Sequence, residues 1–181
     1  MITFLHAIRH ILNGYFKILQ VVVTVLMGLM IVPVSLQIFS RYTGFIPRYI
    51  WTEEAARFCF IWIILLGATI AVREGTHFEV DVLPTPRSAR GEAIGRLVVY
   101  TFMLMFTMVF VTNGYAYALF GFNQTSELTG INMVFIYGVY LLAGISWLLF
   151  LGERIFWALM VIFFGSKEGI AYLRGDHNVA R

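Results

Sequence analysis

Four long apolar segments, separated by short polar stretches, dominate the pattern of this chain. Three of them contain no charged residue and cover Ile18–Ser40, Leu97–Phe120 and Ile131–Gly152. Each can hold the roughly 20 apolar residues that a helix needs to cross a bilayer. The remaining segment, Trp51–Val72, carries charged residues only near its start. The pattern predicts an all-α integral membrane protein, a single domain with four transmembrane helices at residues 17–40, 51–72, 97–120 and 132–154.

The second segment is the most informative, because its charges lie where its length requires a membrane boundary. Its uncharged part, Phe58–Val72, is only about 22 Å long as a helix, whereas a hydrocarbon core is about 30 Å thick. To span, the helix must therefore begin near Trp51. That start places Glu53, Glu54 and Arg57 at one membrane face, where charges are costly enough to need a partner.

The basic residues predict the orientation of the chain. Most of them lie near the termini and in the central loop, residues 73–96, whereas the third connection, Gly121–Gly130, holds no Lys or Arg. The first connection holds only Arg41 and Arg48. The positive-inside rule then puts both termini, the central loop and the tail, residues 165–181, in the cytoplasm.

Each end of the chain extends beyond its nearest span. Residues Ile2–Tyr15 mix apolar and basic groups at helical spacing, which predicts an amphipathic lead-in at the cytoplasmic surface. We expect Ile18–Ser40 to be a retained helix, because it is too long for the apolar region of a signal peptide. A single helix from Ile131 to Phe164 would be about 50 Å long. We therefore expect it to cross the cytoplasmic interface near Glu153 and Arg154, with the aromatic residues beyond lying along the surface or against a partner.

The ionisable residues argue against several functional classes. The chain has 181 residues, 60% hydrophobic and 13% charged, and the interiors of the first and third spans contain no acidic, basic or histidine residue. A self-sufficient pump or exchanger usually needs such groups near the midplane. None of the four histidines lies within a span, as haem ligation would require. The only cysteine, Cys59, cannot form an intrachain disulfide. The basic residues form no patch for nucleic acid, and we expect no cofactor.

Two other functions stay open on the residues alone. His77, Glu79 and Asp81 alternate, so an extended segment would place all three on one side, as in a small membrane metalloenzyme. A solvated loop that caps the end of a helix is the favoured explanation, since a closed metal site wants about four ligands. A stand-alone carrier built from the four spans is the other alternative.

A further pattern runs through the second span and the loop that follows it. It consists of Trp51-Thr52-Glu53-Glu54, Arg57, Trp62, Gly67-Ala68, Arg73-Glu74-Gly75-Thr76-His77 and Val80-Asp81. These residues resemble, in order, the small membrane subunit of tripartite ATP-independent periplasmic (TRAP) transporters, the DctQ-like family. The resemblance is dense over Trp51–Leu83. Elsewhere it rests on length, on the four spans and on topology.

The resemblance implies a set of partners and a division of labour. Such a subunit pairs with a large membrane subunit and a periplasmic substrate-binding protein, and uptake is driven by a sodium gradient. Substrates are usually organic acids such as C4-dicarboxylates or sialic acid. The large subunit holds the sodium and substrate sites and moves its transport domain like an elevator. The small subunit is non-catalytic, packs against the scaffold of the large one in the bacterial inner membrane, and can help dock the binding protein.

The candidate site is accordingly an assembly surface rather than an active site. Glu53 and Glu54 suit the positive end of a helix dipole, and Glu53 can pair with Arg57 at a spacing of four residues. Gly67 and Ala71 form a small pair that would let another helix approach closely. The residues predicted to lie at a partner interface, including lipid headgroups, or at a helix end are Trp51, Glu53, Glu54, Arg57, Trp62, Gly67, Ala71, Arg73, His77 and Asp81.

Overall fold

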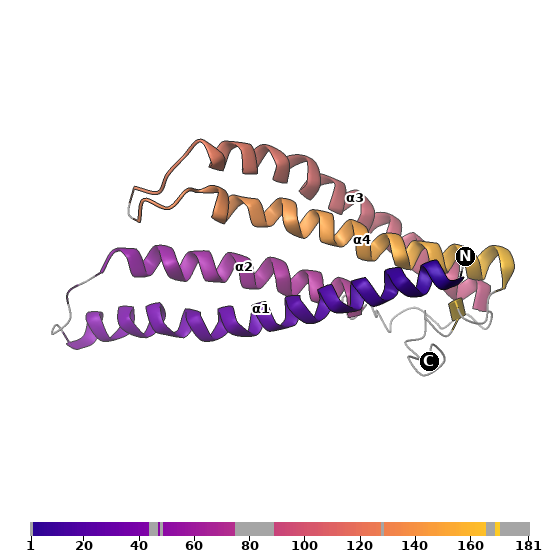
Figure 1. The fold of residues 1–181 in the computed structure, drawn as a ribbon, viewed down its shortest axis with the longest axis horizontal. Helices are drawn as coiled ribbons and strands as arrows, with labels where there is room; N and C mark the ends of the chain where they lie inside the picture. The colour runs from indigo at the N-terminus through magenta and orange to yellow at the C-terminus, as the bar shows by residue number, and fades with distance from the viewer. Residues whose placement is uncertain are drawn as a thin grey trace.

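Four long helices make up most of the described part of the chain in a computed structural model (Figure 1). They are α1 (Ile2–Thr43), α2 (Trp51–Glu74), α3 (Ala89–Phe122) and α4 (Val134–Phe164). The structure describes residues 2–43, 47, 49–74, 89–127, 129–165 and 169–170, with backbone alone for residues 2–9, 89 and 164. The stretches long and apolar enough to cross a membrane are His10–Thr43, Trp51–Glu74, Arg90–Phe122 and Val134–Phe163. The predicted all-α fold with four potential spans is confirmed.

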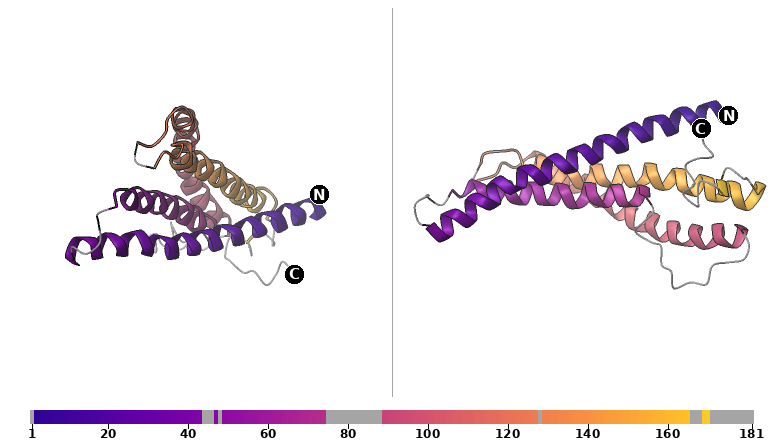
Figure 2. Two further views of the ribbon diagram at one scale, coloured as in Figure 1. Left: turned by 60° about the vertical axis from the view of Figure 1, so that its left-hand side comes forward. Right: turned by 90° about the horizontal axis from the view of Figure 1, so that it is seen from below.

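The helices form two antiparallel hairpins that lie against each other. α1 packs along α2, α3 packs along α4, and α2 joins the hairpins by packing on α4. Both hairpin turns lie at one end of the molecule, and α1 begins at the other end (Figure 1). We call these the hairpin end and the terminal end. At the terminal end α4 ends and α3 begins, and α2 ends on the same side of the molecule but short of them, beside Asn13 of α1 (Figure 1). There α1 and α3 lie on opposite sides of α4 (Figure 2, right).

α4 supplies most of the core. In its most apolar stretch 44% of the residues are buried, against 11% in α1 and 11% in α3. Its fully buried side chains include Val139, Phe150 and Leu151, which form one cluster with Leu66 of α2. The outer helices α1 and α3 therefore present most of their apolar side chains to the surroundings. For a membrane protein, those surroundings are lipid or a partner chain.

Close contact within the second hairpin depends on glycine. A Cβ added to Gly114 of α3 would lie 2.8 Å from the backbone nitrogen of Leu141, and one on Gly144 of α4 would lie 3.0 Å from Val111 Cγ2. Only glycine allows the two backbones to approach so closely. By contrast, a Cβ on Gly67 would have no heavy atom within 4 Å, so Gly67 makes no close helix contact in the part of the chain described.

Two helices extend past the predicted spans at the terminal end. α3 begins at Ala89, inside the predicted loop of residues 73–96, and α4 continues past residue 154 to Phe164. The added turns are stable because they belong to the core: Ala93, Ala158 and Val161 are at most 1% exposed and lie in the same buried cluster. α4 then ends at Gly165, whose positive φ of 60° lets its N–H bond back to the carbonyl of Val161 at 3.0 Å.

α1 is continuous from the predicted lead-in to the end of the first span. Its 42 residues make a helix about 63 Å long, and it passes through Pro33 without interruption. Within the lead-in, Leu12 is buried and the hydroxyl of Tyr15 lies 2.6 Å from the hydroxyl of Ser146 in α4. The described part of the lead-in therefore packs on the bundle instead of forming a separate surface helix.

Candidate functional site

The carboxylates at the hairpin end lie in the first turn of α2. Glu53 and Glu54 both occupy that turn, where the helix dipole favours negative charge. Just before them, the hydroxyl of Thr52 donates a 2.7 Å hydrogen bond to the carbonyl of Tyr49, which fixes the entry into the helix. The structure brings Arg57 within 3.0 Å of Glu53, but both side chains are more than 60% exposed. Such a pair contributes only about 0.5 kcal/mol to stability.

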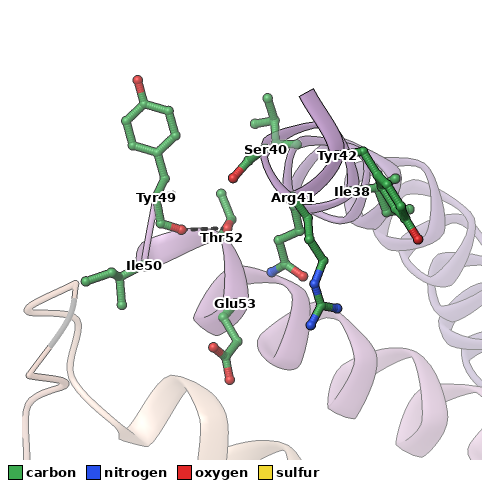
Figure 3. Close-up of a pocket in the computed structure, with 10 residues that line it drawn as sticks. Ile38, Ser40, Arg41, Tyr42, Tyr49, Ile50, Thr52 and Glu53 are labelled. Carbon is green, nitrogen blue, oxygen red and sulfur yellow. Dashed lines mark hydrogen bonds between the residues drawn. The ribbon is translucent and has the colours of Figure 1, made fainter. Parts of the chain in front are cut away.

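An open cavity of about 530 Å³ lies beside these residues, between the end of α1 and the start of α2 (Figure 3). Its polar side chains come from both helices and are Gln37, Ser40, Arg41, Thr52 and Glu53. Two nearby polar atoms, Gln37 Nε2 and Glu54 Oε2, are shielded from solvent and have no hydrogen-bond partner among the described residues. An unpaired buried polar group costs about 1–3 kcal/mol. Both atoms would therefore gain a hydrogen bond from a suitable partner.

The two tryptophans of α2 have different surroundings. Trp51 is 45% exposed, and its ring centroid lies 6.3 Å from that of Tyr49, as in an interfacial aromatic belt. The indole N–H of Trp62 instead donates a 2.8 Å hydrogen bond to the backbone carbonyl of Phe135, at the start of α4. Trp62 therefore links the two hairpins within this chain.

At the terminal end, Arg73 is the centre of a polar cluster. Its Nη1 lies 3.4 Å from Glu153 Oε2, and the two side chains are only 14% and 9% exposed. Its Nη2 donates to Asn13 Oδ1, and its guanidinium lies 4.9 Å from the ring centroid of Phe150. A buried ion pair is tolerated only when further bonds satisfy the charged groups. Here α1 and α4 supply those bonds to the last turn of α2.

Arg154 completes this cluster and connects it to α3. Its Nη2 donates to the backbone carbonyl of Arg73, one of the four α2 carbonyls that have no partner within the helix. Its Nη1 donates a 3.2 Å hydrogen bond to the hydroxyl of Tyr100. We call Asn13, Arg73, Tyr100, Glu153 and Arg154 the terminal polar cluster. All four helices contribute to it, so it fixes their relative positions at this end.

Arg73 is among the residues predicted from the sequence, but its partners are not. A signal was present, because Arg73 and the pair Glu153 and Arg154 end their spans at the same predicted membrane face. Opposite charges at equal depth are expected to pair. Asn13 and Tyr100 carry no comparable signal.

A second link missed by the sequence analysis lies in the middle of the bundle. Thr69 is fully buried, and its hydroxyl accepts a 2.9 Å hydrogen bond from the indole N–H of Trp147 while donating to the carbonyl of Leu65.

The proposed metal ligands His77, Glu79 and Asp81 lie outside the described residues. Within the ranges that the structure describes, no three His, Cys, Asp or Glu side chains are close enough together to hold a metal ion. Cys59 is a free thiol buried in α2. The described part of the site is therefore a set of helix-end polar groups.

Comparison with known proteins identifies the family. Residues 30–161 match the model of the DctQ component of tripartite ATP-independent periplasmic transporters. Over 164 residues the chain is 27% identical to a candidate TRAP transporter small permease protein of Haemophilus influenzae, covering 91% of this chain and 99% of that protein.

Two further relatives are similar over shorter stretches. The C4-dicarboxylate TRAP transporter small permease protein DctQ of Vibrio cholerae is 30% identical over 91 residues, 50% of this chain and 39% of that protein. The isethionate TRAP transporter permease protein DctMQ of Oleidesulfovibrio alaskensis is 31% identical over 71 residues, 36% of this chain and 11% of that protein. With the family model covering most of its length and four helices able to span a membrane, this chain belongs to the DctQ component family, the small permease subunits of TRAP transporters.

Proposed function

We propose that this chain is the non-catalytic scaffold subunit of a sodium-coupled importer of organic acids in the bacterial inner membrane. It packs against a large membrane subunit, which holds the sodium and substrate sites. The relative named DctMQ, a far longer chain that this one matches over 11% of its length, supports a large partner.

The observation that carries this proposal is that the charged side chains at the terminal end bond to other helices of the bundle. Arg73, Glu153 and Arg154 bond to one another and to neutral groups of other helices. Charges committed to holding helices together are suited to a rigid frame rather than to binding and releasing an anion. The outward apolar faces of α1 and α3 supply the surface that a frame needs for its partner and for lipid.

The names of two relatives support the proposed substrate class. One is named for C4-dicarboxylates and one for isethionate, both small organic acids. A C4-dicarboxylate or sialic-acid type of substrate fits this range. We propose that the other subunits select the substrate, since the described charged side chains of this chain lie toward the two ends of the bundle.

The hairpin end is the proposed docking face for the periplasmic binding protein. The positive-inside rule places this end outside, because most Lys and Arg residues belong to the other end. The cavity beside Glu53 and the unpartnered atoms of Gln37 and Glu54 would then face the periplasm. A binding protein that supplies hydrogen-bond donors and acceptors there would satisfy them.

Co-expression with an affinity-tagged large subunit tests the scaffold role. We expect this chain to co-purify at equal stoichiometry and sodium-dependent uptake to disappear when it is deleted. A chain that stays alone after extraction, together with uptake that survives the deletion, would contradict the proposal. Flux through liposomes that contain this chain alone would instead support a stand-alone carrier, and stoichiometric metal lost in His77→Ala would support a metalloenzyme.

A further inference from the structure

An apolar groove opens between α2 and α3, with α4 as its floor. Its volume is about 480 Å³, and it is lined by Ala68, Val72, Val99, Phe102, Met103, Phe106, Thr107 and Trp147. The one hydroxyl in this lining, on Thr107, is already bonded to the carbonyl of Met103 at 2.8 Å. Trp147 is 6% exposed at the floor, while Phe102 and Phe106 are more than half exposed. The groove therefore offers a dry apolar slot with an aromatic rim.

The groove lies in one half of the membrane. Along α3 it runs from Val99 to Thr107, about 12 Å at the helical rise, which is within the roughly 15 Å thickness of one leaflet. Val72 is adjacent to Arg73, so the outer part of the groove lies beside the terminal polar cluster. Its depth matches one acyl chain and falls well short of a path across the bilayer.

A positive charge stands at the mouth of the groove. Arg96 precedes Val99 by three residues and Met103 by seven, so it lies on the α3 face that lines the slot. Its side chain is 31% exposed and lies 3.2 Å from Glu92, four residues earlier. A guanidinium has five N–H donors, so this contact leaves others available. Arg96 can therefore meet a phosphate at the membrane surface.

We propose that this groove binds one acyl chain of an anionic phospholipid whose headgroup is held by Arg96. The proposed orientation places that lipid in the cytoplasmic leaflet. The charge beside the groove favours a lipid as the occupant, because Arg96 lies at the level where an anionic headgroup would meet the membrane surface. The bound chain would fill the space that separates α2 from α3, helices that contact each other little directly.

Fluorescence of Trp147 reports directly on the occupant. The probe is the full chain with Trp51, Trp62 and Trp157 replaced by phenylalanine, placed in phosphatidylcholine vesicles. Phosphatidylglycerol with brominated acyl chains, which quench tryptophan on contact, is added in steps. Saturable quenching at low mole fraction is expected, with brominated phosphatidylcholine quenching only at higher fractions.

Matched substitutions separate the groove from bulk lipid. Arg96→Gln should raise the mole fraction for half-quenching by phosphatidylglycerol about fivefold, the effect of one arginine at an anionic surface. Arg90→Gln, an exposed arginine on another face of α3, should leave it unchanged. Ala68→Phe fills the slot and should abolish the saturable phase, whereas Ile64→Phe, one turn away and outside the lining, should not.

Two results would overturn the proposal. One is that both brominated lipids quench Trp147 equally and that neither Arg96→Gln nor Ala68→Phe changes the quenching. The other comes from native mass spectrometry of the complex with the large subunit: a phosphatidylglycerol adduct on the isolated chain that is missing from the complex would show that protein covers the groove. An adduct retained in the complex and lost in both variants is the expected result. Failure of the complex to assemble would count against the scaffold role, and the quenching result would stand independently.

Discussion

The indole N–H of Trp147 in α4 donates a 2.9 Å hydrogen bond to the hydroxyl of Thr69 in α2, with both side chains buried. The same hydroxyl donates to the carbonyl of Leu65, so both its donor and its acceptor functions are used. This is a bond between the two hairpins at a depth where water is absent. Together with the bond from Trp62 to Phe135, it fixes how far α2 can slide along α4.

Thr69→Val should weaken this link with little change in side-chain shape. The indole N–H of Trp147 would lose its buried acceptor, and we expect the free energy of unfolding to fall by about 1–2 kcal/mol. Unfolding in mixed detergent micelles, followed by tryptophan fluorescence, measures the change. Thr112→Val is the control, because Thr112 is exposed and bonds to a carbonyl of its own helix. Equal stability of the two variants would mean that the interhelical bond adds nothing.

The pair of Arg73 and Glu153 should be coupled strongly. Arg73→Gln removes a cation that lies 3.4 Å from a carboxylate only 9% exposed, so we expect a loss of about 3 kcal/mol in the free energy of unfolding. Arg73→Lys should recover only part, because an ammonium cannot hold Glu153 and Asn13 with the same planar geometry. Arg57→Gln, which breaks an exposed pair, should cost well under 1 kcal/mol.

A double-mutant cycle isolates that coupling. If the two groups act as a pair, the double variant Arg73→Gln with Glu153→Gln should lose less free energy of unfolding than the sum of the two single losses. The difference should be about 0.5–3 kcal/mol. Additive losses would show instead that Arg73 acts mainly through Asn13 and the aromatic ring of Phe150.

The number and type of the helices could be predicted because length and hydropathy decide them. Nearly 20 consecutive apolar residues have no stable place except a spanning helix, and the bilayer thickness then places Glu53 and Arg73 at opposite ends of α2. Twenty residues separate them, about 30 Å of helix, as the bilayer requires. The helix ends were harder: α3 and α4 extend beyond the membrane charges because Ala93, Ala158 and Val161 pack together, which hydropathy does not reveal.

Lateral packing could not be predicted in the same way. In a membrane the lipid-facing side of a helix is as apolar as its protein-facing side, so the spacing of apolar residues does not show which side packs. Gly67 and Gly114 look alike in the sequence, yet only Gly114 lies against another backbone. The indole of Trp62 likewise gave no sign that its acceptor is the carbonyl of Phe135 in α4.

The two carboxylates at the hairpin end should differ in importance. Glu54 has a shielded oxygen with no partner among the described residues, whereas Glu53 is exposed and paired with Arg57. If a partner protein bonds to the shielded oxygen of Glu54, Glu54→Gln should weaken the affinity of assembly or docking about tenfold or more. Glu53→Gln should weaken it much less. Uptake by cells and co-purification with the tagged partners measure this, with membrane insertion checked by immunoblot.

The double substitution extends the same test. Glu53→Ala with Glu54→Ala should lower transport while the chain still inserts. Normal uptake by that variant would mean that both carboxylates only stabilise the start of α2 through the helix dipole. That result would contradict the docking role proposed for the hairpin end.

Substitutions at two glycines should separate contacts within the chain from contacts with its partner. Gly114→Ala places a methyl group 2.8 Å from the backbone of Leu141, so the α3–α4 hairpin must open. We expect the free energy of unfolding of the isolated chain to fall by about 1–3 kcal/mol. The higher helix propensity of alanine, about 1 kcal/mol relative to glycine, should not offset this loss. Gly67→Ala meets open space and should leave the isolated chain as stable or slightly more stable.

Assembly with the large subunit should show which helix of this chain faces that partner. If Gly67 and Ala71 lie against a helix of the large subunit, Gly67→Leu will leave the isolated chain folded but reduce its co-purification, because a larger side chain holds the two backbones apart. Gly28→Leu on α1, which also has no neighbour within 4 Å, provides a second position for the same measurement. Loss of assembly in one variant and not in the other identifies the helix that faces the partner. Full assembly of both would place these glycines toward lipid and leave the partner contact to α3.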